Sequence, residues 1–214
     1  NDFYLFKRLL NKRQDYTHYV ILPHFIDNED EAEALIDTLP KEKLIILDKR
    51  LKRVKGNHAS IYEDFEGDIY KALEHALPVL SKYDTLRLIF HKKSYLPVDI
   101  KRGFNNFCQQ YAFERGIVDT ITKIELKKGE VYICVNDDDL VSLLDKIKES
   151  SFVIGKDIGI ISYNDTPLKK YMVGGITTIS TDYKQMGVLT AKAISDNLTQ
   201  QIALDFCLQL RSSL

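Results

Sequence analysis

The feature that most constrains this chain is a repeated alternation between short, uniformly apolar runs and longer stretches with helical periodicity. Residues 19–22 and 44–47 are apolar throughout, whereas residues 29–39 between them place apolar side chains three and four positions apart. Further strands are predicted at 60–62, 86–90, 131–135, 158–161, 177–179 and 203–210, and helices at 3–11, 65–81, 98–114, 138–148 and 182–198. Because strands that are apolar on both faces need helices on both sides, the pattern predicts an α/β fold with parallel sheets.

Charge and cysteine content narrow the class of protein. The 214 residues include 30 Lys and Arg and 31 Asp and Glu, and no run of like charges resembles an arm for nucleic acid. The acidic segment 27–33 and the basic segment 49–55 are interpreted as solvated loops or helix ends. No apolar stretch has the length needed to cross a bilayer. Cys108, Cys134 and Cys207 fit neither a disulfide framework nor a zinc site. Buried free thiols indicate a cytoplasmic protein, with an exported protein that lacks disulfides as the alternative.

Polar residues follow most of the predicted strands. In parallel α/β sheets, ligands bind beyond the carboxyl ends of the strands, so these positions are the candidate site. They are His24, Asp48, His91, Asn136 with Asp137, and Asn164 with Asp165. The acidic run 137–139 begins a predicted helix and is interpreted as compensating the helix dipole rather than binding a cation. Without a nucleophile elbow, a Gly-rich phosphate loop or a metal-spaced cluster, no enzyme, cofactor or metal site is expected.

The C-terminal third carries the most specific motif of the sequence. Residues 155–167 read GKDIGIISYNDTP. This segment resembles a pattern of the LacI/GalR family of transcription regulators, in which Gly, an acidic residue and a strand lead into an aromatic, paired acids and Thr. The match continues through GITTI at 175–179, Tyr183, residues 186–187 and the ending RSSL. Weaker matches lie at Asp48, 63–67 and 103–104. The spacing is similar to that of effector domains behind a GntR-type winged-helix head.

The resemblance implies two Rossmann-like lobes joined by a three-strand hinge, as in type I periplasmic binding proteins. One lobe would comprise residues 1–62 and 181–204, and the other residues 63–180 and 205–214. Such effector domains open with a strand, a helix and a second strand before the helix that matches residues 3–11. We therefore expect the first lobe to be incomplete in this sequence, and the DNA-binding head to lie outside it.

The function implied by the resemblance is that of a ligand-gated transcription regulator. A small-molecule effector, a monosaccharide or a sugar derivative, would close the lobes, change the geometry of a homodimer and alter the affinity of the head for operator DNA. The alternative is a solute-binding protein of a sugar ABC importer, which shares the architecture. The loop at 164–167 with Thr177 and Thr178 is typical of the regulators.

The resemblance assigns ligand contacts to four residues, and each has a structural alternative. Asn136 matches an amide that contacts the effector, but it also stands where a helix cap is expected. Asn164 occupies the place of the first of the paired acids, which in the family accepts hydroxyl hydrogen bonds. Asp48 matches a hydroxyl contact or caps its loop, and Tyr183 covers a sugar ring or belongs to the core. Asp165, the second acid, is expected to hold its loop through backbone N–H groups.

One departure from the family pattern concerns the anchor of the sugar. The family commonly has an Arg three residues before the Gly at 103, and here that position is Ile100. Lys101 and Arg102 do not inherit its direction, because neighbouring residues of a helix point about 100° apart. The change implies a less hydroxylated sugar, a phosphorylated one, or another anchor such as His24 or His91, although loop histidines are more often structural or solvated.

Overall fold

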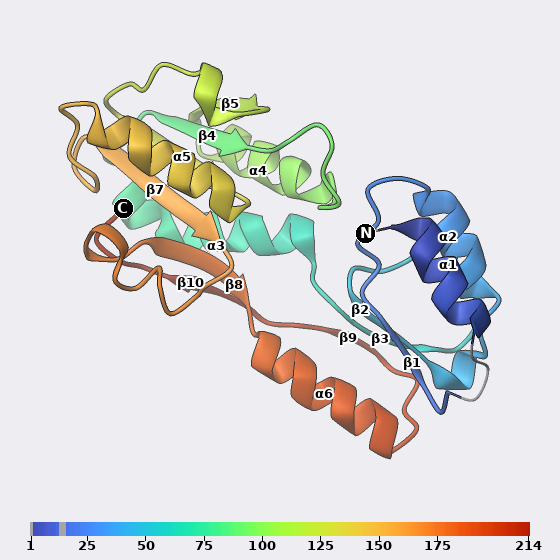
Figure 1. Ribbon diagram of the computed structural model, residues 1–214. Coiled ribbons are helices and arrows are strands. Elements are labelled where there is room, and N and C mark those ends of the chain that lie inside the picture. Colours follow the sequence, from blue (N-terminus) through green and yellow to red (C-terminus); the bar gives the residue numbers. More distant parts are fainter. Residues whose placement is uncertain (1, 13–15) are drawn as a thin grey trace. The chain divides into compact units, whose positions relative to one another are not determined.

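The computed structural model describes residues 2–12 and 16–214, and its chain divides into two compact units (Figure 1). Unit 1 comprises Asn1–Asp64, Tyr95–Pro97 and Asp182–Asp205, and unit 2 comprises Phe65–Ser94, Val98–Thr181 and Phe206–Leu214. The short segment Tyr95–Pro97 belongs to unit 1, although the sequence places it within a continuous second lobe. Within unit 1, Tyr95 stacks on His24 with ring centroids 4.4 Å apart.

Unit 1 is built on a four-stranded parallel sheet with the order β1-β2-β3-β9. Its elements are β1 (Tyr19–Ile21), β2 (Leu44–Asp48), β3 (Ala59–Tyr62), β9 (Gln201–Ala203), α1 (Phe3–Lys12), α2 (Glu29–Asp37), α6 (Tyr183–Ser195) and the 3-10 turn η1 (Lys41–Lys43). Successive side chains of β2 point to opposite faces. Leu44 and Ile46 therefore join one core with α2, while Ile45 and Leu47 join a second core with α6. Helices on both faces explain why this strand is apolar throughout.

Unit 2 has a six-stranded sheet with the order β10-β8-β7-β6-β4-β5, in which only β10 runs antiparallel to its neighbour. The strands are β4 (Thr85–Ile89), β5 (Glu114–Val118), β6 (Glu130–Cys134), β7 (Ile158–Tyr163), β8 (Thr177–Thr181) and β10 (Phe206–Gln209). The helices are α3 (Phe65–Leu80), α4 (Asp99–Gln110), α5 (Asp137–Lys148) and the 3-10 turns η2 (Ile121–Lys123) and η3 (Met172–Gly174). The α/β fold with mostly parallel sheets that the sequence predicts is confirmed.

Two predicted elements are wrong in their extent. The helix expected to reach residue 114 ends at Gln110, and Glu114–Val118 forms the edge strand β5. An edge strand needs little apolar sequence, which is why its two charged residues and Gly116 read as a helix end. The strand expected over 203–210 is two strands in two sheets, because the chain passes from unit 1 to unit 2 after Asp205.

The acidic and basic segments of unit 1 neutralise each other, which the interpretation as separate solvated segments did not anticipate. Lys49, which is only 8% exposed, places its Nζ 2.5 Å from Glu29 Oε1, and Arg53 Nη1 lies 2.6 Å from Asp30 Oδ1. The Arg53 backbone N–H also donates to Glu33 Oε2. The loop after β2 is thereby fixed along α2.

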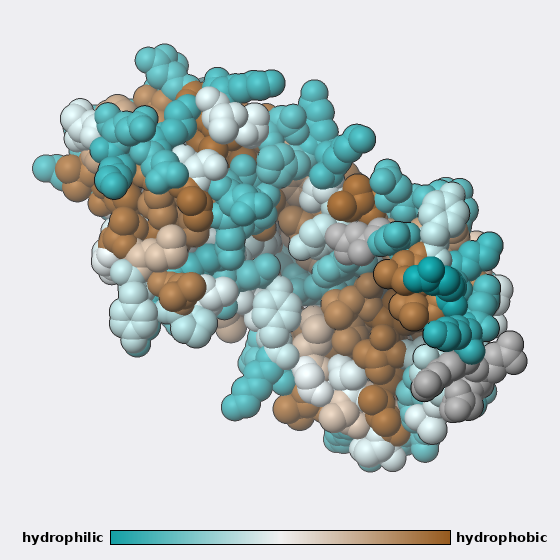
Figure 2. All heavy atoms as spheres, viewed as in Figure 1, coloured by the Kyte–Doolittle hydropathy of each residue, from teal (hydrophilic) through white to brown (hydrophobic). Residues whose placement is uncertain are grey.

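Part of the apolar surface of unit 1 remains open. No residue of α1 is buried, although Phe3 and Phe6 pack partly against the core. In the described chain β1 pairs with a strand on one side only, and Val20 and Leu22 are 45% and 53% exposed. Figure 2 shows apolar side chains gathered over the sheet of this unit.

The cysteines divide into two classes. Cys108 and Cys134 are buried free thiols, and burial raises the pKa of Cys108 to about 12 and the pKa of Cys134 further. Cys207 is exposed, which corrects the expectation of three buried thiols. It lies on β10 at the edge of the sheet, where alternate residues face outward. Among the described residues no helix has both the length and the apolar character of a membrane span.

Candidate functional site

In unit 1 a histidine and an aspartate meet at the carboxyl ends of two neighbouring strands. His24 follows β1 and Asp48 ends β2, and the His24 Nε2–H donates to Asp48 Oδ2 at 2.7 Å. The Asp48 side chain is 9% exposed and that of His24 26%. Asp48 has a left-handed backbone with φ 73, a conformation that Asp adopts more readily than most residues. Its carboxylate accepts from His24, and its carbonyl oxygen accepts the Glu63 backbone N–H.

Two tyrosines lie close to this pair. Tyr95 stacks on the His24 ring, and Tyr183 begins α6, which Asp182 caps by accepting the Gln185 backbone N–H at 2.8 Å. Burial raises the pKa of Tyr183, and the negative charges of Glu63 and Asp48 raise it further. Burial and the same two carboxylates raise the pKa of Tyr95. At 45% exposed, Tyr183 is not part of the core. Unit 1 therefore combines aromatic faces with two carboxylates and an imidazole.

In unit 2, Asn136 and His91 share a partner. The Asn136 Oδ1 accepts the Asp139 backbone N–H at 2.8 Å, so Asn136 caps α5. His91 follows β4, and its Nε2 lies 3.0 Å from Oδ2 of the buried Asp139. His91 is thus tied to the structure through Asp139, and its own side chain remains 40% exposed.

The acidic run at the start of α5 is largely compensated. Asp139 pairs with His91, and Asp137 Oδ1 lies 2.7 Å from Lys169 Nζ. Across the part of the chain that the structure describes, no group of three His, Cys, Asp or Glu residues is arranged to hold a metal ion.

Asn164 follows β7 and, like Asp48, has a left-handed backbone, with φ 63. Its N–H donates to the Ile179 carbonyl at 2.8 Å, and its own carbonyl accepts from Lys169 Nζ at 2.8 Å. The peptide groups around Asn164 are therefore fixed by partners on both sides. Each unit thus places an Asp or Asn side chain at the end of a buried strand, where the backbone turns left-handed.

Asp165 has a partner different from the one expected. Its two carboxylate oxygens accept from the two terminal nitrogens of Arg211, each at 2.8 Å, rather than from backbone N–H groups. Arg211 lowers the pKa of Asp165, and Asp165 raises that of Arg211. Arg211 Nη1 also donates to the Ile176 carbonyl and to Thr178 Oγ1. The expectation was wrong because the two residues lie far apart in the sequence.

The motifs that carry the family resemblance therefore form one structural clamp. A Cβ added to Gly155 would lie 2.1 Å from the Ser212 carbonyl oxygen, so this position requires Gly. Ser213 Oγ donates to the Ile160 carbonyl and accepts the Thr177 backbone N–H. Much of the motif holds the C-terminus against β7 and β8, and Asn164 follows β7 at the strand end.

The segment where the family commonly has an arginine supplies no replacement for it. Ile100 is fully buried. Lys101 Nζ lies 4.3 Å from the centroid of the Phe90 ring, and Arg102 pairs with Glu66 and Asp99. Each of the three side chains is engaged within unit 2, so the change at residue 100 is not compensated by its neighbours.

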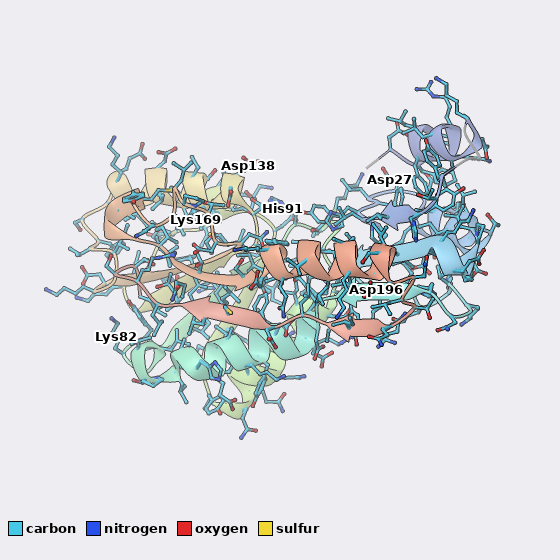
Figure 3. The ribbon with its side chains drawn as sticks, turned by 90° about the horizontal axis from the view of Figure 1, so that it is seen from below. Asp27, Lys82, His91, Asp138, Lys169 and Asp196 are labelled. Carbon is cyan, nitrogen blue, oxygen red and sulfur yellow. The ribbon has the colours of Figure 1, made fainter. Side chains whose placement is uncertain are left out.

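The structure adds residues to the candidates that the sequence offers. In unit 1 it brings His24 and Asp48 together, with Tyr183 close to Asp48. Tyr95 and Glu63 are further residues of this group that the sequence did not suggest. In unit 2 it joins His91 to Asn136 through Asp139, and Asn164 to the same helix start through Lys169. Figure 3 labels His91, Asp138 and Lys169 of this unit. No local pattern marked Tyr95 or Lys169, because their partners are distant in the sequence.

The chain is similar to a known protein family and to several solved structures. The family model described as "Periplasmic binding protein-like domain" matches residues 81–205. A sugar-binding transcriptional regulator of the LacI family from Escherichia coli, solved with phosphate, has a TM-score of 0.73 at 16% identity, covering 98% of this chain and 80% of that chain. A transcription regulator-like protein from Staphylococcus haemolyticus has a TM-score of 0.77 at 18% identity, with coverages of 99% and 80%. The lactose repressor bound to an anti-inducer has a TM-score of 0.74 at 18% identity, with coverages of 98% and 82%. The search of curated proteins gives no match.

Proposed function

Since this chain belongs to the periplasmic binding protein-like domain family and has the fold of LacI-family regulators, we propose that it is the effector-binding and dimerisation domain of a bacterial transcription regulator. It would act in the cytoplasm, and a DNA-binding head outside this sequence, of the GntR type, would contact the operator. The observation that carries the proposal is the set of polar side chains at the carboxyl ends of buried parallel strands in both units. Effector binding would favour closure of the lobes, and closure would alter DNA binding.

The chemistry of these side chains favours a monosaccharide or a sugar derivative as effector. Carboxylate and amide groups, as in Asp48, Asn136 and Asn164, bridge sugar hydroxyls, and hydrogen bonds to a charged group are the stronger ones. The rings of Tyr95 and Tyr183 offer aromatic faces for the C–H surface of a sugar. His24 and His91 would contribute donors or acceptors whose tautomer is set by Asp48 and Asp139.

The alternative function, a solute-binding protein of a sugar importer, has less support. The solved structures with this fold that are named above are described as transcription regulators. An upstream winged helix would support the regulator, and an upstream signal peptide the importer.

We propose, in addition, that the first lobe is incomplete in residues 1–62 and 181–204, and that further chain covers β1 in the intact protein. The support is the open edge of β1 with its exposed Val20 and Leu22. The second lobe would comprise residues 63–180 and 205–214.

A homodimer is also part of the proposal. In unit 2 the loop after β7 exposes three large apolar side chains, Leu168, Tyr171 and Val173, at 75%, 76% and 53%. Exposed apolar clusters are typical of interaction surfaces. Tyr171→Asp should convert a dimer to a monomer in sedimentation velocity, whereas a dimer that persists in this variant removes the loop from the interface.

The direct test of effector binding is a thermal-shift screen of the intact protein. The panel contains aldoses such as D-glucose and D-galactose, their 6-phosphates, and purines and amino acids as unrelated classes. A sugar at about a hundred times its Kd should stabilise the protein by about 2.7 kcal/mol. If an unrelated class raises the midpoint and no sugar does, the sugar proposal fails.

Variants then test the site without disturbing the fold. Asn164→Gly keeps the left-handed backbone and removes the amide, and Asn136→Ser keeps an oxygen that can cap α5. Both should reduce the shift that a sugar produces. Asn197→Gly is a matched control, because Asn197 is also left-handed, with φ 50, and is an exposed residue that follows the C-cap of α6. An unchanged shift in both site variants would remove Asn136 and Asn164 from the proposal.

A further inference from the structure

Lys169 is a buried lysine whose role the proposed function does not explain. It follows β7, and only 2% of it is exposed. Its Nζ donates to the carbonyl oxygens of Tyr163 and Asn164 at 2.6 and 2.8 Å, and lies 2.7 Å from Asp137 Oδ1. These three partners use all three donors of the ammonium group. A buried charge is tolerated when it is paired and fully hydrogen-bonded, and Lys169 meets both conditions.

The partners of Lys169 belong to the two segments that carry the side-chain amides of Asn136 and Asn164. Asn164 is itself one of them, held in its left-handed conformation with its N–H bonded to Ile179 and its carbonyl bonded to Lys169. Asp137 directly follows Asn136, which caps the same helix, α5. Since β6 and β7 are neighbours in the sheet, the lysine ties together the ends of two adjacent strands.

We propose that Lys169 is a positioning residue that sets the spacing and orientation of the Asn136 and Asn164 side-chain amides. The inference rests on the proposed function, because two amides at a fixed spacing select ligands by the spacing of their hydroxyl groups. A positioning residue acts through the groups it holds, so Lys169 itself makes no contact with the effector. Misplacing a hydrogen-bonding group lowers the affinity for the ligand, while the unliganded fold is retained.

Unit 2 also contains a matched control. Lys146 on α5 donates to three backbone carbonyls, those of Ile121, Thr122 and Ile124, around the turn η2. It has the same number of bonds as Lys169, and none of them reaches the segments of Asn136 or Asn164. Lys169→Met and Lys146→Met each remove an ammonium group with three partners. Only the first should disturb the two amides.

The first measurement needs no ligand. Nitrogen-15 relaxation of the Asn136 and Asn164 side-chain amide groups in the intact protein should show lower order parameters in Lys169→Met than in wild type, and unchanged values in Lys146→Met. Lys169→Gln, which retains donors without the charge, should lie between. If Lys169→Met does not fold, Asp137→Asn supplies the same test with one partner altered. Unchanged amides in the Lys169 and Asp137 variants, or equal changes in Lys146→Met, would overturn the inference.

The second measurement uses D-glucose, D-galactose and their 6-phosphates as probes. For any of these that binds wild type, we expect about a tenfold loss of affinity in Lys169→Met and a change within about twofold in Lys146→Met. Equal losses in the two variants would reduce Lys169 to a general structural role. If none of the sugars binds wild type and an unrelated class of ligand does, the sugar proposal fails, and amide mobility alone decides whether Lys169 positions the two side chains.

Discussion

Unit 1 and unit 2 share the parallel α/β design but differ in how completely their helices are buried. In unit 2, seven residues of α3 and five residues of α4 are buried. In unit 1, α2 and α6 bury two each, and α1 buries none. The helices of unit 2 are therefore more deeply packed against their sheet, whereas unit 1 leaves apolar surface open at α1 and β1. Polar strand ends of the kind that bind ligands are therefore found both on a well-packed sheet and on one whose helices are less completely buried.

The largest expected difference between the units concerns their cores. Phe104 on α4 is fully buried, and Phe104→Ala should lower the free energy of unfolding by about 3–5 kcal/mol. Phe6 in unit 1 is half-buried and contacts Phe25 with centroids 5.1 Å apart. Phe6→Ala should cost about 1 kcal/mol. Urea unfolding measures both free energies.

Hydrogen exchange shows whether the two units respond separately. In Phe104→Ala the loss of amide protection should be confined to unit 2, because regions with independent cores open with independent free energies. Equal loss of protection in both units would mean that they unfold together, and the comparison would then describe packing alone.

A smaller difference is expected for the arginines. Arg211→Ala removes a bidentate bond to Asp165 and two further hydrogen bonds, and the Arg211 side chain is only 16% exposed. Its loss should destabilise unit 2 by about 2–3 kcal/mol. Arg53 in unit 1 pairs with Asp30, but these side chains are 62% and 68% exposed. Arg53→Ala should change stability by less than about 1 kcal/mol. Chemical denaturation of both variants checks the contrast, and similar values would contradict it.

Acid should destabilise unit 2 through Asp165. Arg211 holds the folded-state pKa of Asp165 below the unfolded value of about 3.9, so the ionised carboxylate stabilises the fold. This contribution is complete above the unfolded pKa and is lost as the pH falls through the folded pKa. Asp165→Asn should therefore make the stability of unit 2 less dependent on pH below about 4.

In unit 1 the corresponding residue is Asp37, whose pKa is lowered by the Lys55 backbone N–H and by Lys41. The direction of the pH effect is the same, but this carboxylate is open to solvent, so a weaker effect is expected. Denaturation midpoints between pH 2 and 5 compare Asp165→Asn with Asp37→Asn. A larger change in the Asp37 variant would reverse the ranking of the two units.

The sequence predicts elements whose environment is the same along their length. β2 and β7 are buried on both faces, so their uniform apolar character identifies them without further information. β5 has only Ile117 and Val118 as strong apolar residues, because an edge strand needs few buried side chains. The break between β9 and β10 has no local mark, since only the topology decides which sheet each strand joins.

In the candidate site, the positions of the residues can likewise be predicted from the sequence, whereas their partners cannot. Parallel topology requires Asp48, Asn136 and Asn164 to lie at the carboxyl ends of strands, so their positions follow from sequence. Their partners do not, because His24, Tyr95 and Lys169 reach them through contacts between segments that are separated in the chain. The Arg211–Asp165 clamp is the clearest case: sequence resemblance identified both residues but not their bond.

The smallest expected effect concerns the open edge of unit 1. Val20 on β1 is 45% exposed, and Val20→Lys in this 214-residue chain should change the free energy of unfolding by about 0.5 kcal/mol or less. Ile45→Lys, on the neighbouring buried strand, serves as the positive control for a buried site. If further chain covers β1 in the intact protein, the same Val20→Lys change will there bury a lysine and cost several kcal/mol, about as much as other unpaired buried charges. A cost that stays small in the intact protein would show that the edge is solvent-exposed in both, and the difference between the two units would then be a property of the complete fold.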